Sequence, residues 1–231
     1  MIIGGFQRFS LIDYPNKICA IVFTQGCNFR CPYCHNPELI SPEQNRDARG
    51  LSSKHILSFL EQRTGKLDAV TVTGGEPLLQ PDLGSFIKQL KGLGYSVKLD
   101  TNGSLPLELE RLIEARSIDY IAMDIKSSLN NYERVSRATI DTGTITASIR
   151  MIMDSGLDYE FRTTVVKSLL EKADFYAIGR MIQGARLYVL QRFVPSKHLE
   201  NELSNAPDYS DEELDSLKGI MEGFVKRCMI R

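Results

Sequence analysis

Short apolar runs alternate with amphipathic segments along most of this sequence. Each run has the length of a buried strand, and the segments between runs repeat apolar residues every three or four positions, as helices do. The expected strands cover residues 18–23, 69–73, 95–99, 119–123, 159–166 and 186–193. The expected helices have apolar faces at residues 56–60, 83–90, 109–113, 145–153, 171–182 and 214–228.

Polar and glycine residues mark the ends of several expected helices. Ser53 is placed to cap the first helix, and Ser210 with Glu213 makes a capping-box pattern at the start of the last one. Gly92 and Gly94 follow the second helix, where a residue in the left-handed conformation commonly ends a helix. These boundaries support the alternation of strands and helices.

Six strand–helix units in alternation predict an α/β fold with a parallel sheet and right-handed crossovers. Six units are too few for an eight-fold barrel, so an open partial barrel and a doubly wound sheet both fit the pattern. The length of 231 residues suits one domain. We expect this domain to comprise an N-terminal segment (1–16), the strand–helix region (17–194) and a C-terminal loop and helix (195–231).

Polar motifs follow four consecutive strands. Residues from Gly26 onward come after the first strand, residues 73–77 after the second, residues 100–103 after the third, and Asp124 with Lys126 after the fourth. In both candidate folds, ligands bind where the parallel strands end. We therefore expect the four motifs to contribute to one site.

The overall composition argues against several classes of function. Charged residues make up 25% of the chain and the formal net charge is −1, so we expect neither a nucleic-acid partner nor a membrane surface. No apolar run approaches the roughly 20 residues that a membrane-spanning helix needs. The first residues lack a basic segment followed by an apolar one, so we see no secretory signal and expect a cytoplasmic protein.

Three of the five cysteines are clustered on one short segment. Cys27, Cys31 and Cys34 are separated by three and then two residues, whereas Cys19 lies in the first strand and Cys228 on an apolar helix face. An odd number of cysteines without an export signal argues against a disulfide framework. Clustered thiols in a reducing compartment favour a metal site instead.

The number and spacing of these thiols bear on the kind of metal. Thiolates select zinc, copper(I) or iron–sulfur clusters. Structural zinc takes four ligands, commonly as two separated pairs, and His35 next to Cys34 is a poor fourth ligand because adjacent residues seldom point at the same metal. A fully ligated four-iron cluster takes four cysteines. Three cysteines leave one iron open, which is what a catalytic cluster requires.

The pattern Cys-x-x-x-Cys-x-aromatic-Cys at residues 27–34, with Tyr33 as the aromatic, resembles the signature of the radical S-adenosylmethionine superfamily. The resemblance covers nearly the whole chain and implies a partial (β/α)6 barrel with parallel strands. It also implies a [4Fe–4S] cluster on Cys27, Cys31 and Cys34, with S-adenosylmethionine bound at the open iron. In that family, reductive cleavage of S-adenosylmethionine gives a 5′-deoxyadenosyl radical that abstracts a hydrogen atom.

The same resemblance implies which residues contact the cofactor. The segment after the second strand is similar to the family's Gly-Gly-Glu-Pro motif, which binds the methionine amino group; glycines allow close backbone approach, and a glutamate accepts from an ammonium. Other segments are similar to those that supply aspartates for a monovalent cation and positive charge for the cofactor carboxylate. Each also has a simpler interpretation as a turn, a helix cap or a surface ion pair. The implied cofactor-binding residues are Tyr33, Gly74, Gly75, Glu76, Asp100, Thr101, Asn102, Asp124, Lys126 and Arg162.

Three features narrow the choice of substrate. The chain is short, it has no second cysteine cluster, and residues 9–15 and 34–38 are similar to the activating proteins of anaerobic ribonucleoside-triphosphate reductases. This resemblance implies an oxygen-sensitive activase that removes hydrogen from a backbone glycine of a glycyl radical enzyme, anaerobic ribonucleotide reductase being the expected partner. It also implies flavodoxin or ferredoxin as electron donor. Asp13 is then the expected catalytic group near the entering glycine loop, since such chemistry depends on close positioning.

Two other functions stay open at this point. A small-molecule radical enzyme, such as a 7-carboxy-7-deazaguanine synthase, shares the short barrel and the three-cysteine loop but requires a closed substrate pocket. A non-enzymatic zinc or electron-transfer protein would leave Glu76 and Asp100 unexplained. Formation of 5′-deoxyadenosine would separate the radical enzymes from the metal-binding protein.

Overall fold

The strands form where the apolar runs of the sequence lie. The computed structural model describes residues 1–41, 51–194, 203 and 208–231. These residues form two units, the first made of Met1–Asn28, Asn36–Thr101 and Leu105–Ile121, and the second of Phe29–His35, Asn102–Ser104 and Ala122–Arg231. Both units combine helices with mostly parallel strands, so the predicted α/β class is confirmed.

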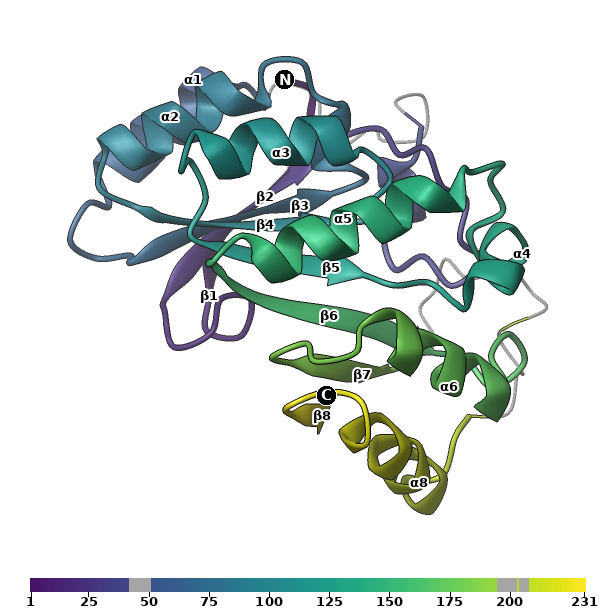
Figure 1. Ribbon diagram of the computed structural model, residues 1–231. Coiled ribbons are helices and arrows are strands. Elements are labelled where there is room, and N and C mark those ends of the chain that lie inside the picture. The colour runs from purple at the N-terminus through teal and green to yellow at the C-terminus, as the bar shows by residue number, and fades with distance from the viewer. Residues whose placement is uncertain (42–50, 195–202, 204–207) are drawn as a thin grey trace. The chain divides into compact units, whose positions relative to one another are not determined.

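In the first unit, the strands pair in the order in which the chain makes them. β1 (Ile3–Ser10) is antiparallel to β2 (Cys19–Thr24), which is parallel to β3 (Ala69–Gly74), and β3 is parallel to β4 (Ser96–Thr101). The strand β2 is almost continuously apolar and buried, as parallel strands covered by helices are, and the first four residues of β3 are buried although Thr71 is among them. The helices α1 (Ser53–Glu61), α2 (Leu83–Gly92) and α3 (Pro106–Glu114) lie along these strands (Figure 1). The 3-10 turn η1 (Pro37–Leu39) follows β2, and the 3-10 turn η3 (Pro77–Leu79) follows β3.

The second unit repeats this construction with its own strands. β6 (Asp158–Val165), β7 (Tyr188–Arg192) and β8 (Cys228–Ile230) are parallel neighbours. The helices of this unit are α4 (Tyr132–Ser136), α5 (Thr142–Asp154), α6 (Lys172–Met181) and α8 (Asp211–Glu222), with a 3-10 turn η4 (Leu129–Asn131) before α4. Strand β5 (Tyr120–Asp124) begins in the first unit and ends in the second. None of the helices that the structure describes is both long and apolar enough to cross a membrane.

Every one of the six predicted strands is present, but two further strands were not predicted. β1 lies inside the expected N-terminal segment. Its buried and exposed residues do not alternate as in a half-buried strand, since Gln7, Arg8 and Phe9 are all exposed. β8 has only three residues, too few to show a period of two. Both strands form because a neighbouring strand supplies their hydrogen bonds, which sequence periodicity does not reveal.

Two predicted helix boundaries are wrong. The last helix ends at Glu222 with Gly223 as its C-cap, so Cys228 lies on β8 and not on a helix face. The first helix is capped by Ser52, whose hydroxyl accepts from the N–H of His55, and Ser53 is its first residue. The capping box of the last helix at Ser210 is confirmed. The expected C-terminal loop falls on residues 195–202 and 204–207, outside the described residues.

Candidate functional site

The loops after β2 and β3 touch through their backbones in the first unit. The N–H of Gly75 donates to the carbonyl of Thr24 at 2.9 Å, and the N–H of Glu76 donates to the carbonyl of Gly26 at 2.8 Å. A Cβ atom on Gly75 would lie 2.0 Å from the carbonyl oxygen of Gly26, and one on Gly74 would lie 2.2 Å from the nitrogen of Thr24. Gly74 also has a φ of +123°, which favours glycine. Only glycines therefore allow this contact.

Glu76 follows the two glycines and is buried, with 1% of its surface exposed. Its Oε1 accepts from the N–H of Leu78 at 3.1 Å and from the hydroxyl of Thr101 at 2.8 Å. Thr101 is the last residue of β4, so the carboxylate links the ends of two parallel strands. A buried carboxylate held by two donors is a rigid acceptor, which suits recognition of an ammonium group.

Asp100 has a partner that the sequence motif did not include. Lys98 lies two residues earlier on β4 and therefore on the same face of the strand, and its Nζ is 2.7 Å from Oδ1 of Asp100. The Lys98 side chain is only 3% exposed. β4 holds other polar residues too, Ser96 and Thr101 among them, so no feature of the sequence singles out Lys98 as the partner of Asp100.

The cysteine loop passes from the first unit into the second. Cys27 belongs to the first unit, where its N–H donates to the carbonyl of Ile40 at 3.3 Å. Cys31 and Cys34 belong to the second, and the N–H of Cys34 donates to the carbonyl of Cys31 at 3.1 Å. All three residues are half-buried and none of the five cysteines is in a disulfide. Within the described ranges, no three His, Cys, Asp or Glu side chains are already grouped as a metal site.

Three charged residues predicted for the cofactor meet in the second unit. Nζ of Lys126 lies 3.0 Å from Oδ2 of Asp124, and Nε of Arg162 lies 2.8 Å from Oδ1 of the same carboxylate. Burial by itself would raise the pKa of Asp124, but the two cations outweigh it and hold that pKa well below its usual range. Burial by itself would lower the pKa of Lys126, and the carboxylate of Asp124 outweighs it, so this pKa is raised. All three groups are thus charged at neutral pH.

The same lysine lies beside the cysteine loop. Nζ of Lys126 is 6.0 Å from the centre of the Tyr33 ring. Burial raises the pKa of the Cys31 thiol, and the Lys126 ammonium opposes that rise. Tyr33 is itself buried, with 4% of its surface exposed, and its contact with a cofactor stays a prediction.

The segment after β4 continues into the second unit as a local turn. Oδ1 of Asn102 accepts from the N–H of Ser104 at 3.0 Å and from its hydroxyl at 2.6 Å. Gly103 has a φ of +74°, and the hydroxyl of Ser148 donates to its carbonyl at 2.8 Å. The turn interpretation of Asn102 is therefore supported, and its role toward a cofactor stays a prediction.

Asp13 lies in the connection between β1 and β2, before the start of β2. Its carbonyl accepts from the hydroxyl of Thr71 at 3.3 Å, and the hydroxyl of Ser10 donates to its carboxylate. Thr71 comes three residues before Gly74, the end of β3, which is about 10 Å along a strand. The structure therefore does not bring Asp13 next to Glu76, and its role at a glycine loop stays a prediction.

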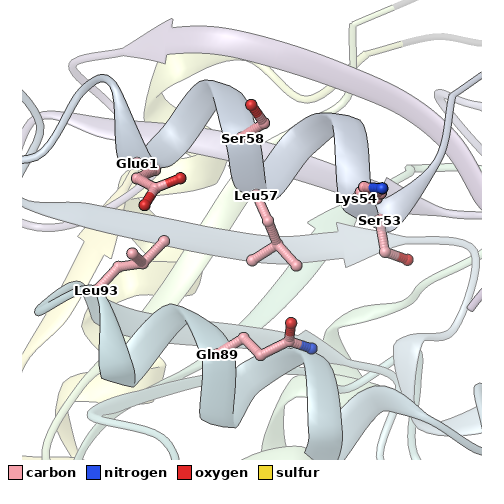
Figure 2. Close-up of a pocket in the computed structure, with 7 residues that line it drawn as sticks. All are labelled: Ser53, Lys54, Leu57, Ser58, Glu61, Gln89 and Leu93. Carbon is pink, nitrogen blue, oxygen red and sulfur yellow. The ribbon is translucent and has the colours of Figure 1, made fainter.

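A groove on the outer helices is separate from these residues. It lies between α1 and α2 (Figure 2), and none of the predicted site residues lines it. The lining residues are Ser53, Lys54, Leu57, Ser58, Glu61, Gln89 and Leu93.

Comparison with known proteins agrees with the cysteine motif. The sequence matches the profile of the Radical SAM superfamily over residues 21–172. A Methanocaldococcus jannaschii protein named as a glycyl-radical enzyme activating enzyme is 32% identical over 235 aligned positions, which cover 100% of this chain and 95% of that protein. The pyruvate formate-lyase-activating enzyme of Streptococcus mutans is 28% identical over 202 positions, covering 83% of this chain and 75% of the relative.

Solved structures share the fold. The crystal structure of Streptococcus suis SuiB bound to S-adenosylmethionine superimposes with a TM-score of 0.67, covering 91% of this chain and 49% of that chain, at 12% identity. This chain belongs to the radical SAM superfamily. Membership implies a [4Fe–4S] cluster and S-adenosylmethionine as cofactors.

The donors in this chain fit these cofactors. Three thiols on one loop match a cluster with an open iron, because thiolates are the ligands of iron–sulfur clusters. The glycine-lined backbone contact beside Glu76 offers an acceptor for an ammonium, and Lys126 with Arg162 offers positive charge for a carboxylate. Amino and carboxylate groups are both present in S-adenosylmethionine.

Proposed function

We propose that this chain is an activase that generates a glycyl radical on a partner enzyme. The observation that carries the proposal is the similarity over the full length to the M. jannaschii protein named as a glycyl-radical enzyme activating enzyme. A likeness to the S. mutans pyruvate formate-lyase-activating enzyme over 83% of this chain supports the same activity. Both alignments extend well beyond the cysteine loop.

When bound, the cluster would supply one electron to S-adenosylmethionine, whose sulfur–carbon bond breaks to give methionine and a 5′-deoxyadenosyl radical. The chemistry supplied in this way would remove one hydrogen atom from the α-carbon of a glycine, giving 5′-deoxyadenosine and leaving the unpaired electron on the partner. We propose flavodoxin or ferredoxin as the source of the electron. The protein's own contribution is to hold the cofactor and the glycine close together, since positioning is a large part of such catalysis.

The residues described above have distinct proposed roles. Cys27, Cys31 and Cys34 would ligate the cluster. Glu76 with its glycines would bind the methionine amino group. The remaining proposed cofactor contacts, which include the ligands of a monovalent cation, are Tyr33, Asp100, Thr101, Asn102, Asp124, Lys126 and Arg162.

We propose anaerobic ribonucleotide reductase as the partner. The proposal rests on residues 9–15 and 34–38, which resemble the activating proteins of those reductases. Asp13 lies in the first of these segments and is proposed to act near the entering glycine loop. The setting would be anaerobic, because oxygen attacks an exposed iron.

The proposal is tested under anaerobic conditions. The chain is reconstituted with iron and sulfide, reduced, given S-adenosylmethionine, and assayed for 5′-deoxyadenosine, with and without a candidate reductase. Electron paramagnetic resonance then reports a glycyl radical on the partner. Formation of 5′-deoxyadenosine without a glycyl radical on any glycyl radical enzyme would favour a small-molecule radical enzyme instead.

Two variants with matched controls test the assigned roles. Cys31→Ala should lose both the cluster and cleavage of the cofactor, whereas Cys228→Ala, a buried cysteine on β8, should keep both. Glu76→Gln keeps the carbonyl oxygen that accepts from Leu78 and Thr101 but removes the charge, so it should weaken cofactor binding and leave the cluster spectrum unchanged. The exposed Glu61→Gln is its control.

A further inference from the structure

A buried carboxylate lies two residues before Arg162 on β6. Glu160 has no exposed surface, and residues two apart on a strand share a face. A buried carboxylate is costly unless it is paired and hydrogen-bonded. Arg231 supplies that pairing, because its Nη1 lies 3.0 Å from Oε1 and its Nη2 lies 2.9 Å from Oε2 of Glu160. This bidentate geometry is the strong and directional form of an arginine–carboxylate pair.

The backbone of Arg231 is held firmly at the end of β8. Its N–H donates to the carbonyl of Leu190 at 2.9 Å, and its carbonyl accepts from the N–H of Arg192 at 2.7 Å. β8 pairs with β7, and β7 pairs with β6, as Figure 1 shows. The backbone of Arg231 is therefore held in place by β7, and its side chain extends to Glu160 on β6, the strand on the other side of β7.

Glu160 in turn flanks Arg162. Nη1 of Arg162 lies 3.9 Å from Oε1 of Glu160, while its Nε lies 2.8 Å from Asp124. The guanidinium group is planar, so carboxylates on two of its sides fix its orientation. Lys126, Asp124, Arg162, Glu160 and Arg231 thus form a row of alternating charge from the predicted cofactor residues to the C-terminal strand.

We propose that Glu160 and Arg231 are positioning residues that orient Arg162 toward the carboxylate of S-adenosylmethionine. The inference rests on the proposed function, in which Lys126 and Arg162 are cofactor contacts, and on their positive charge, which suits that carboxylate. Glu160 is fully buried, whereas the Arg231 side chain is 39% exposed. An ion pair with a buried carboxylate contributes little stability compared with apolar residues of the same size, so we infer that its role is to orient a binding group. Neither residue belongs to the motifs by which the sequence suggested a site.

The test compares two ligands that differ only in the carboxylate. Binding of S-adenosylmethionine and of decarboxylated S-adenosylmethionine to the reconstituted, oxidised protein is measured by equilibrium dialysis. Arg231→Met should weaken S-adenosylmethionine about tenfold, the loss expected from one charge-assisted hydrogen bond, and leave the decarboxylated ligand unchanged. Arg231→Lys keeps the charge but loses the bidentate geometry, so its affinity for S-adenosylmethionine should lie between those of Arg231→Met and the wild type. The exposed Arg227→Met should bind both ligands as the wild type does.

Other outcomes have separate meanings. Equal weakening of both ligands by Arg231→Met, or a lower melting temperature with both affinities unchanged, would show that Glu160 and Arg231 are structural and would overturn the inference. Should Arg231→Met not fold, Glu160→Gln, which keeps the shape of the side chain, gives the same comparison of the two ligands. A wild-type protein that binds neither ligand would overturn the proposed cofactor itself. A wild type that binds S-adenosylmethionine but activates no glycyl radical enzyme would overturn only the activase assignment, and the ratio between the two ligands would still decide the inference.

Discussion

Replacement of Gly75 by alanine tests the backbone contact beside the proposed cofactor acceptor. The added Cβ would lie 2.0 Å from the carbonyl oxygen of Gly26 and 3.1 Å from that of Leu39, whereas ordinary contacts begin at 3.4 Å. Both obstructing atoms belong to the backbone, so no side-chain rotation relieves the overlap. The loops after β2 and β3 would have to separate by about 1.4 Å. That movement takes the hydrogen bond from Glu76 to Gly26, now 2.8 Å long, beyond bonding distance.

The loss of folding free energy in Gly75→Ala can be worked out from these contacts. Forcing an extra carbon into a packed site costs about 1–3 kcal/mol, and losing the hydrogen bond costs about 1 kcal/mol more. The expected destabilisation is therefore about 2–4 kcal/mol. For a chain of this size it corresponds to a fall in melting temperature of roughly 4–16 °C. Because Glu76 moves with its backbone, S-adenosylmethionine should also bind more weakly.

The assay is thermal unfolding followed by circular dichroism, together with cofactor binding. Gly84→Ala is the matched control in the same unit, since its Cβ would lie 3.8 Å from the nearest atom, in a helix where alanine is favoured by about 0.5–1 kcal/mol. It should leave the melting temperature unchanged or raise it slightly. A melting temperature and a cofactor affinity for Gly75→Ala equal to those of the wild type would refute the reasoning.

Two further predictions concern a helix cap and a buried charge. Ser210→Ala removes the hydroxyl that accepts from the N–H of Glu213 at the start of α8. It should lower the free energy of unfolding, measured by urea titration, by about 1 kcal/mol. Ser216 is exposed on the same helix, and Ser216→Ala should not lower the free energy of unfolding. The pKa of Asp124 is lowered when the chain folds, so its ion pairs with Lys126 and Arg162 contribute stability that is complete above its ordinary pKa of 3.8 and is lost as the pH falls through the lowered value. Asp124→Asn should therefore be less stable than the wild type at pH about 6, and the difference should shrink below pH 3.8. An equal difference at pH about 6 and about 3 would contradict the lowered pKa.

The sequence alone was enough to predict the α/β class and the positions of the six inner strands. Parallel strands covered by helices are mostly apolar, so β2 stands out as an apolar run, and β3 as a short run of β-branched residues. The spacing of Cys27, Cys31 and Cys34 was equally informative, because these three proposed ligands lie on one short segment of the chain. The roles of individual site residues in binding the cofactor remain predictions.

What the sequence left out depends on contacts between distant parts of the chain. β8 forms through its pairing with β7, and Arg231 meets Glu160 across a separation of 71 residues. Lys98 could be recognised as a partner of Asp100 only once both were placed on the buried face of β4. Periodicity and motifs report local preferences, which is why they located strands, helices and the cysteine loop. Which charges pair inside the fold is decided by the three-dimensional packing, because a buried charge is stable only beside a partner that the folded chain brings to it.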